Sequence, residues 1–160
     1  PMRHACLSFA ALPLAALVAS CAAIGPPALV AQPRATIERV FETYNHCNIE
    51  DLVSNFADGN LVFFTPGTPE PVSTRAGLRK YFSYLSEDPC ASPQSVKHTD
   101  IQLQVRSVAA TAAVVHATTV VRYMQDNIAQ SQPYFFTFVL QEVGGQWLIV
   151  SQNAQPVPKR

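Results

Sequence analysis

Three polar side chains near the C-terminus are the first candidates for chemistry. Ser151, Gln152 and Asn153 follow a strand-like apolar stretch that runs from Trp147 to Val150. Hydroxyl and amide groups can hold a ligand through hydrogen bonds, but they do not titrate near neutral pH. With a strand period of two, Ser151 and Asn153 should share the face of Trp147. Either these residues line a pocket, or the strand simply reaches solvent here.

His116 and Arg122 form a second candidate set. With Thr118 they alternate along one face of a predicted strand whose other face is largely apolar. If the polar face looks into a pocket, His116 and Arg122 suit an anionic or carbonyl-bearing ligand. If it looks outward, they are surface or interface residues, and antiparallel sheets commonly leave one face in solvent.

Tyr44 is the third candidate. It continues a helical apolar stripe formed by Ile37, Val40 and Phe41, and this phase turns its ring inward. A core tyrosine usually finds a backbone partner for its hydroxyl. The alternative is a hydroxyl that reaches into the pocket.

Composition excludes several functions. Eleven basic and eleven acidic residues give a formal net charge of zero, so the electrostatic footprint of a nucleic-acid partner is missing. The four cysteines include no C-x-x-C pair, and we predict neither a metal site nor a cofactor. The acids on the predicted strands, Asp100, Asp126 and Glu142, fall at strand ends and turns, where a carboxylate is most simply solvated.

The N-terminus has the pattern of a secretory signal. A short basic start precedes an apolar run from Ala5 to Val18, which is too short to span a bilayer. The letters V-A-S-C then resemble a bacterial lipobox, so we expect lipidation at Cys21 and a periplasmic protein that touches the membrane only through this anchor; the alternative is ordinary cleavage after Ser20 or Ala23. The predicted division is a signal peptide (1–20), a tether (21–33) and one folded domain (34–160).

Export changes how the remaining cysteines are interpreted. Cys47 and Cys90 are the only two in the predicted domain, and exported compartments permit disulfides. They are either bridged or two inert buried thiols, because the sequence does not show whether their Cα atoms come within about 7 Å.

The elements that must position these residues follow from periodicity and turn signals. Helices are predicted from Thr36 through Tyr44, from Asn48 through Phe56 and from Arg75 to Ser86, with Ser73 or Thr74 as a cap. Strands are predicted over residues 61–65, 97–107, 112–124, 134–143 and 146–153, with a hairpin at Gly144-Gly145. Helices followed by a run of strands predict an α+β fold.

Three segments carry a resemblance to a known family: TIERVFETYN, TRAGLRKYFSYL and YFFTFVLQEVGGQWLIVSQN. They resemble the nuclear transport factor 2-like superfamily, which includes SnoaL-like and ketosteroid-isomerase-like proteins, over about residues 34–158. More narrowly, the chain is similar to the group of calcium/calmodulin-dependent protein kinase II association domains and iota-class carbonic anhydrases. The resemblance implies a cystatin-like cone: a curved antiparallel sheet wrapped around an N-terminal helix, with a pocket inside.

The resemblance also bears on catalysis. Carbonic anhydrase-like relatives end the last strand with His-His-Ser-Ser, where this chain has Gln152-Asn153-Ala154-Gln155. Neither Gln nor Asn can move protons near neutral pH, so we expect no carbonic anhydrase activity. The leading prediction is a domain that binds a small apolar or carbonyl-bearing ligand, or an oligomerisation module. The alternative is a SnoaL-like isomerase, cyclase or lyase that uses His116 or Tyr44.

One strand further predicts self-association. In the segment after Pro133, Phe135, Thr137 and Val139 alternate with an aromatic row, so that both faces are largely apolar. Such a strand is normally covered on both sides. One face covers the first helix, and the other predicts a homodimer or higher homo-oligomer, which members of the resembled family form through the outer face of the sheet.

Overall fold

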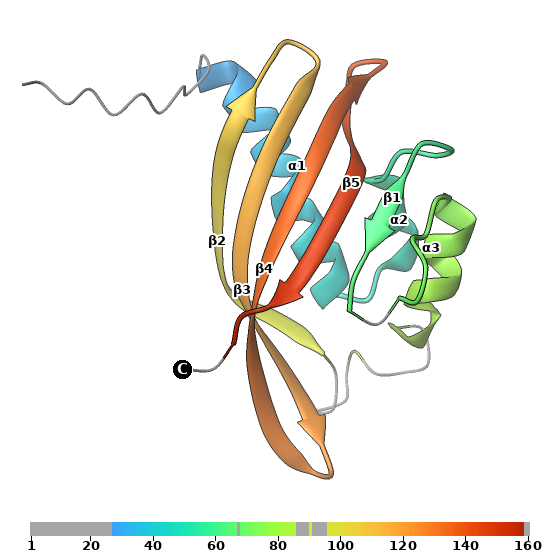
Figure 1. Cartoon of the computed structure of the whole chain (residues 1–160), viewed down its shortest axis with the longest axis vertical. Helices are drawn as coiled ribbons and strands as arrows, with labels where there is room; N and C mark the ends of the chain where they lie inside the picture. Colours follow the sequence, from blue (N-terminus) through green and yellow to red (C-terminus); the bar gives the residue numbers. More distant parts are fainter. Residues whose placement is uncertain (1–26, 67, 86–89, 91–95, 159–160) are drawn as a thin grey trace, which may run out of the picture.

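Helices precede a curved sheet in this α+β chain (Figure 1). The computed structural model describes residues 27–66, 68–85, 90 and 96–158. The helical elements are α1 (Pro27–Asn45), α2 (Ile49–Ser54), α3 (Arg75–Tyr81) and the 3-10 helix η1 (Phe82–Leu85). The strands are β1 (Val62–Phe64), β2 (Lys97–Val108), β3 (Ala112–Gln125), β4 (Ile128–Val143) and β5 (Gln146–Pro156). The fold class predicted from the sequence is confirmed.

The sheet has the strand order β1-β5-β4-β3-β2. The four long strands form an antiparallel meander, and the short β1 adds a parallel strand beside β5, so the complete sheet is mixed. Figure 1 shows the long strands crossing in front of α1, with α3 beside β1 at the far edge. The helices therefore cover one face of the sheet, and the other face carries none of the described elements.

The core lies between α1 and the face of the sheet that α1 covers. Ile37 and Phe41 of α1 are buried there with Phe138 and Ile149 of the sheet. The Phe41 ring stands edge-on to the ring of Phe138, with centroids 6.0 Å apart. Each fully buried side chain of this size stabilises the fold by about 1.5–3 kcal/mol.

Helix α1 begins earlier than the sequence pattern predicts. It starts at Pro27, so that residues 27–33, predicted as part of a tether, form its first turns. A proline at the first helical position costs nothing, because its missing N–H would have no partner there. Pro33 then lies inside the helix and is buried, although it looks like a helix boundary in the sequence. The predicted signal peptide and Cys21 lie outside the described residues.

Strand β4 also begins earlier than the predicted Tyr134. Asp126 and Asn127 have φ angles of 52° and 60°, which form a two-residue turn between the paired residues Gln125 and Ile128. The β3–β4 hairpin therefore extends beyond the rest of the sheet (Figure 1). At the other end of β4, the predicted turn at Gly144-Gly145 is present, and both glycines have positive φ.

Candidate functional site

A cavity of about 290 Å³ lies between α1 and the concave face of the sheet. Its wall is mainly aromatic and aliphatic, and none of the described lining residues carries a formal charge at neutral pH. The lining residues are Val40, Phe41, Tyr44, Leu52, Phe56, Phe63, Thr65, Pro66, Tyr81, Phe82, Tyr84, Val96, His98, Val121, Tyr134, Phe136, Phe138, Gln152 and Ala154.

His98 is a buried titratable group of the cavity wall. Its Nδ1 lies 3.0 Å from the Thr119 hydroxyl, and its ring packs against Tyr44 and Phe136 with centroids 4.7 and 5.5 Å away. Burial lowers the pKa of His98 to about 4. The imidazole is therefore neutral at physiological pH and offers the cavity an uncharged hydrogen-bonding nitrogen.

Asn45, at the end of α1, holds the backbone of His98 in place. Its side-chain Nδ2 donates to the His98 carbonyl at 2.8 Å, and its Oδ1 accepts from the His98 N–H at 2.8 Å. This pair of bonds ties the helix to the start of β2. The position of the imidazole thus depends on α1 as well as on the sheet.

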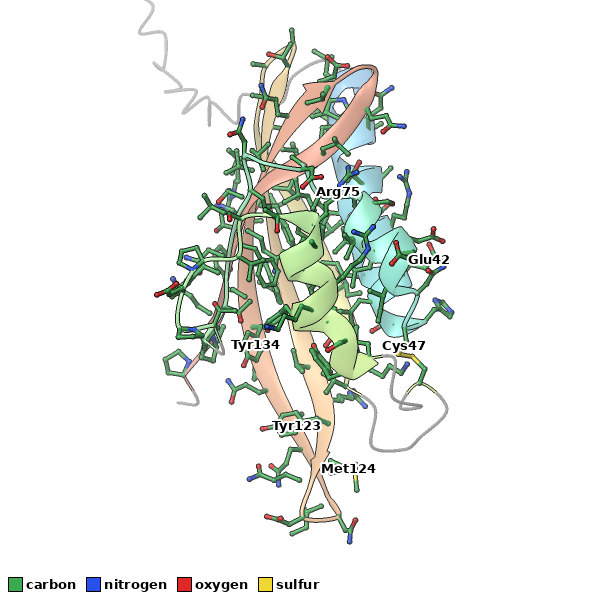
Figure 2. All side chains as sticks on the ribbon, turned by 90° about the vertical axis from the view of Figure 1, so that its right-hand side faces the viewer. Glu42, Cys47, Arg75, Tyr123, Met124 and Tyr134 are labelled. Atoms are coloured by element: carbon green, nitrogen blue, oxygen red, sulfur yellow. A yellow bond between two sulfur atoms is a disulfide. The ribbon has the colours of Figure 1, made fainter. Side chains whose placement is uncertain are left out.

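Tyrosine hydroxyls supply further hydrogen-bonding groups. The hydroxyls of Tyr44 and Tyr84 lie 3.0 Å apart, and the Tyr81 hydroxyl lies 3.0 Å from Thr65 Oγ1. Burial raises the pKa of Tyr44, so its phenol stays protonated. Tyr134 lines the cavity near the base of the β3–β4 hairpin, and Figure 2 shows Tyr123 farther out along that hairpin.

Gln152 is the buried amide of the site. The residue is only 6% exposed and lines the cavity, and its side chain makes no hydrogen bond with any described residue. Its backbone lies between Phe63 of β1 and Phe138 of β4 in the sheet. None of the buried side-chain nitrogen and oxygen atoms of the described residues lacks a hydrogen-bond partner, so the amide of Gln152 is open to the cavity rather than sealed in its wall.

A β-bulge in β5 decides which C-terminal residues reach the cavity. Leu140 pairs with Ile149, whereas the preceding Val139 pairs with Ser151, so that Val150 is an extra residue. An inserted residue reverses the alternation of faces beyond it. Gln152 and Ala154 therefore continue the buried Trp147 face, and Ser151 and Asn153 point the other way. The prediction that Ser151 and Asn153 share the face of Trp147 is therefore wrong, because the bulge reverses the alternation before these residues.

His116 and Arg122 lie on the outer face of β3. The inner positions of this strand, such as Val115 and Thr119, are buried, while His116 is half-buried and Arg122 is exposed. His116 accepts a hydrogen bond at 3.2 Å from Arg106 Nε and packs against the ring of Phe135. Arg122 donates to Thr99 Oγ1 at 3.1 Å. Of the two orientations left open by the sequence, the structure has the outward one.

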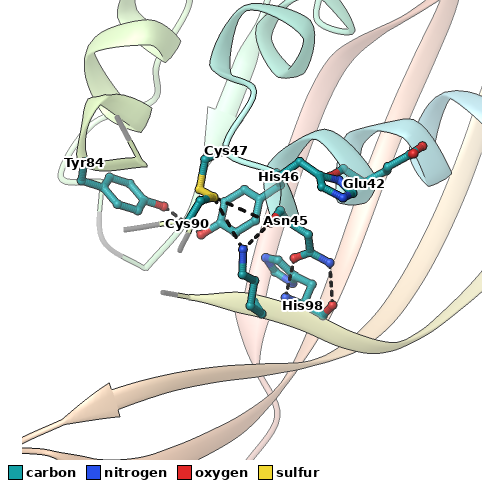
Figure 3. Close-up of a disulfide and its surroundings, with 9 residues drawn as sticks. Glu42, Asn45, His46, Cys47, Tyr84, Cys90 and His98 are labelled. Atoms are coloured by element: carbon teal, nitrogen blue, oxygen red, sulfur yellow. Dashed lines mark hydrogen bonds between the residues drawn. A yellow bond between two sulfur atoms is a disulfide. The ribbon is translucent and has the colours of Figure 1, made fainter. Parts of the chain in front are cut away.

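Cys47 and Cys90 are joined by a disulfide, with their Cα atoms 5.9 Å apart. Cys47 lies two residues after the end of α1, close in sequence to Tyr44 and Asn45. The bond therefore stands next to the cavity wall (Figure 3).

Several groups of the site lack a local sequence signal. His98 and Tyr84 are cavity residues that strand alternation and helical phase do not predict. Thr119 lies on the face of β3 that the sequence predicts as core, and His98 is paired with Val121 of that strand. The pairing of His98 with Val121 brings His98 close to Thr119, and this pairing has no signal in the local sequence.

Within the described ranges, no group of three or more His, Cys, Asp or Glu side chains is arranged to hold a metal ion. Of the helices that the structure describes, none is long and apolar enough to cross a bilayer.

Comparison with known families identifies one match. The family model of the SnoaL-like domain covers residues 34–157. A search of curated proteins returns no significant match.

Solved structures resemble this chain over most of its length. A ketosteroid isomerase-like protein from Erwinia carotovora has a TM-score of 0.66 and 17% identity, covering 84% of this chain and 100% of its own. A putative dehydratase of the NTF2-like family from Streptomyces avermitilis has a TM-score of 0.65 and 19% identity, with coverages of 84% and 100%. A putative calcium/calmodulin-dependent protein kinase II association domain from Xanthomonas campestris has a TM-score of 0.65 and 20% identity, with coverages of 94% and 95%. At these identities the likeness shows the fold alone.

Proposed function

Because the chain belongs to the SnoaL-like domain family, we propose that its cavity binds a small, uncharged and largely apolar ligand that carries a hydroxyl or carbonyl group. The observation that carries this proposal is the amide of Gln152, which opens into an apolar cavity and makes no hydrogen bond with a described residue. A ligand oxygen would supply the missing hydrogen bond. Pockets that are mainly apolar with a few convergent polar groups are typical of small-molecule sites.

The absence of charge on the described cavity wall favours an uncharged ligand. Burying an ionised carboxylate without a cation beside it costs several kcal/mol. His98 does not supply that cation at neutral pH, because burial lowers its pKa to about 4. Aromatic rings such as Phe63, Phe82 and Phe136 instead favour a flat or hydrophobic body.

Three related probes test this binding mode. 2-Naphthol is an uncharged aromatic alcohol; naphthalene lacks its hydroxyl, and 2-naphthoate carries a charge. We expect 2-naphthol to bind about tenfold more tightly than naphthalene, which corresponds to one hydrogen bond of about 1.4 kcal/mol, and 2-naphthoate to bind most weakly.

A matched pair of variants locates the binding. Ala154→Phe places a ring in the cavity and should abolish 2-naphthol binding in calorimetry. Glu42→Phe places the same ring on the exposed side of α1 and should leave binding unchanged. Equal binding of the three probes, or full binding by Ala154→Phe, would contradict the proposal.

A second candidate function is catalysis in the same cavity, of the isomerase, cyclase or lyase class. The observation that favours it is His98, a neutral imidazole beside Thr119 that could move a proton. A ketone probe distinguishes the two. If the cavity is catalytic, the protein should accelerate exchange of the α-protons of 2-tetralone with D₂O, and His98→Gln should remove the acceleration. A binding domain leaves the exchange at the buffer rate.

We further propose that the outer face of the sheet is a self-association surface. Phe135, Thr137 and Val139 of β4 alternate with buried residues and are half-buried themselves. At the neighbouring edge, Val62 and Phe64 of β1 are 51% and 42% exposed. A group of exposed apolar side chains on one face of a sheet is typical of an interface. The likeness to an association domain agrees with this proposal.

Export with a lipid anchor is also proposed. The apolar run that ends in V-A-S-C supports it. The Cys47–Cys90 disulfide adds support, because stable disulfides are typical of oxidising compartments. Cys21→Ser should release the protein from the membrane fraction of cells that export it. A wild-type protein found entirely in the soluble fraction would contradict the lipidation at Cys21.

A further inference from the structure

The two sulfur atoms of the Cys47–Cys90 disulfide lie in different electrostatic surroundings (Figure 3). The ammonium group of Lys97 lies 3.5 Å from the Cys90 sulfur. The same ammonium donates a hydrogen bond to the carbonyl of Asn45, the last residue of α1. A nearby cation stabilises a thiolate, so Cys90 has the surroundings of a good leaving group.

Cys47 lies beside the end of a helix. It is two residues after Asn45, the last residue of α1, a helix of 19 residues whose carbonyl end carries a partial negative charge. The Cys47 N–H donates to the Tyr44 carbonyl at 3.0 Å, which keeps the residue against that helix end. The Asn45 carbonyl also lies 3.8 Å from the Cys90 sulfur, so the difference between the two cysteines depends on the Lys97 ammonium, which lies 3.5 Å from the Cys90 sulfur and favours a thiolate there.

The backbone conformation of Cys47 is one that normally favours glycine, which suggests that a cysteine occupies this position because of its sulfur. Its φ is 54°, in the left-handed region, and it occupies the position after a helix where glycine is usual. The N–H of Asn48 donates to the Thr43 carbonyl at 2.9 Å, which completes this helix-ending motif. A side chain here costs about 1–2 kcal/mol relative to glycine.

We propose that Cys47–Cys90 is a site of thiol–disulfide exchange for small thiols and dithiols, with Cys90 as the leaving group. Both cysteines are half-buried rather than buried, which leaves them within reach of solvent. A thiolate attacks the Cys47 sulfur and forms a mixed disulfide there. The Cys47–Cys90 bond breaks, and its electron pair leaves with Cys90 as a thiolate beside Lys97.

A dithiol completes the reduction. Its second thiolate attacks the reagent's own sulfur in the mixed disulfide, and Cys47 departs as a thiolate. The protein disulfide gains two electrons, the dithiol becomes a cyclic disulfide, and the two protons of the dithiol pass to the cysteines or to solvent.

Reduction also removes a crosslink beside two contacts of the cavity wall. These are the Tyr44–Tyr84 hydroxyl pair at 3.0 Å and the Asn45–His98 pair at 2.8 Å. We expect reduced protein to bind 2-naphthol several-fold more weakly. This consequence rests on the proposed ligand-binding function, whereas the exchange chemistry does not.

The site of glutathione attachment tests the exchange directly. The full, folded chain is treated with reduced glutathione, quenched with acid at intervals, and mapped by peptide mass spectrometry. We expect glutathione on Cys47 in at least about fivefold excess over Cys90, because the leaving thiol is the one that is more stable as a thiolate. Equal attachment, attachment mainly at Cys90, or reaction only in denaturant would overturn the proposal.

Variants of Lys97 test whether its charge makes Cys90 the leaving group. Lys97→Met should slow reduction about threefold and reduce the preference for Cys47, since the departing thiolate loses its cation. Lys97→Arg keeps the charge and should keep the wild-type rate. Lys80→Met, at an exposed position of α3, is the matched control and should change nothing. An unchanged rate in Lys97→Met would exclude Lys97 as the cause. If glutathione attaches mainly at Cys47 but reduction leaves the affinity for 2-naphthol unchanged, the exchange proposal stands and its link to ligand binding is contradicted.

Discussion

Gln152 is the residue on which the proposed binding mode depends most. Its amide opens into the cavity and makes no hydrogen bond with a described residue. A ligand that covered this amide without bonding to it would leave a buried polar group unsatisfied, at a cost of about 1–3 kcal/mol. The amide therefore selects ligands that carry a hydrogen-bonding group.

Gln152→Leu should therefore separate stability from binding. We expect the free energy of unfolding to rise by about 1 kcal/mol, because an apolar side chain of similar size fills the same space. The affinity for 2-naphthol should fall about tenfold. Asn153→Leu, on the opposite face of β5, is the control for both measurements. A Gln152→Leu protein that is less stable and binds normally would contradict this role.

His98 predicts how stability depends on pH. Burial lowers its pKa to about 4 from the ordinary 6.5. Between these values the unfolded chain binds the proton and the folded chain does not, so the free energy of unfolding falls as the pH decreases through this window. The loss can reach about 3 kcal/mol at pH 4, at 1.36 kcal/mol for each pKa unit.

Denaturant titrations from pH 7 to pH 4 measure this effect. In His98→Gln the part of the decrease that belongs to His98 should disappear. His46→Gln, at an exposed position after α1, should retain it. If wild type and His98→Gln lose the same stability over this range, His98 is not the buried neutral group described above.

Helical phase is the sequence pattern that best predicted a cavity residue. Tyr44 lies inward as the stripe of α1 predicts, and its hydroxyl meets Tyr84. His98 carried no comparable pattern, because its environment is built by α1, β3 and β4 together. Local spacing cannot report a contact between elements that are distant in the sequence.

At the scale of elements, one extra residue in β5 determines the composition of the site. The bulge at Val150 exchanges the faces of every residue after it, which brings Gln152 inward and turns Asn153 outward. Periodicity predicted the strand itself but not the irregularity within it, because a bulge depends on how β5 pairs with β4. The same limit applies to α1, which starts at Pro27 and contains Pro33, although the sequence pattern predicts a tether over these residues.

The Cys47–Cys90 disulfide should stabilise the fold at the end of α1. The two cysteines are 43 residues apart, and a crosslink over such a loop typically contributes about 2–4 kcal/mol to the free energy of unfolding. The variant Cys47→Ala/Cys90→Ala should lose this amount. Cys47→Gly/Cys90→Ala should lose about 1 kcal/mol less, because glycine fits the φ of 54° without cost. Equal stabilities of the two variants, measured by urea unfolding, would contradict the cost assigned to this helix end.

At the scale of the whole molecule, α1 covers the inner face of the sheet, and apolar side chains of β4 lie on the outer face beside polar ones such as His116 and Asn153. Val139 is half-buried on the other face, between the inward-facing Phe138 and Leu140. If this face joins two copies, Val139→Lys should convert the dimer to a monomer, because it places a charge in an apolar interface. Multi-angle light scattering at micromolar concentration measures the change. Glu42→Lys, on the exposed side of α1, should remain dimeric, and a monomeric wild-type protein would rule this interface out.

The position of a bound probe tests the central claim most directly. Nuclear Overhauser effects between 2-naphthol and the folded protein report which protons lie within about 5 Å of the ligand. We predict contacts from the naphthol ring to the Ala154 methyl group and to the side-chain amide of Gln152, which lie together on the cavity wall. Contacts confined to the outer face, at Val62 or Phe64, would show that the cavity is not the binding site.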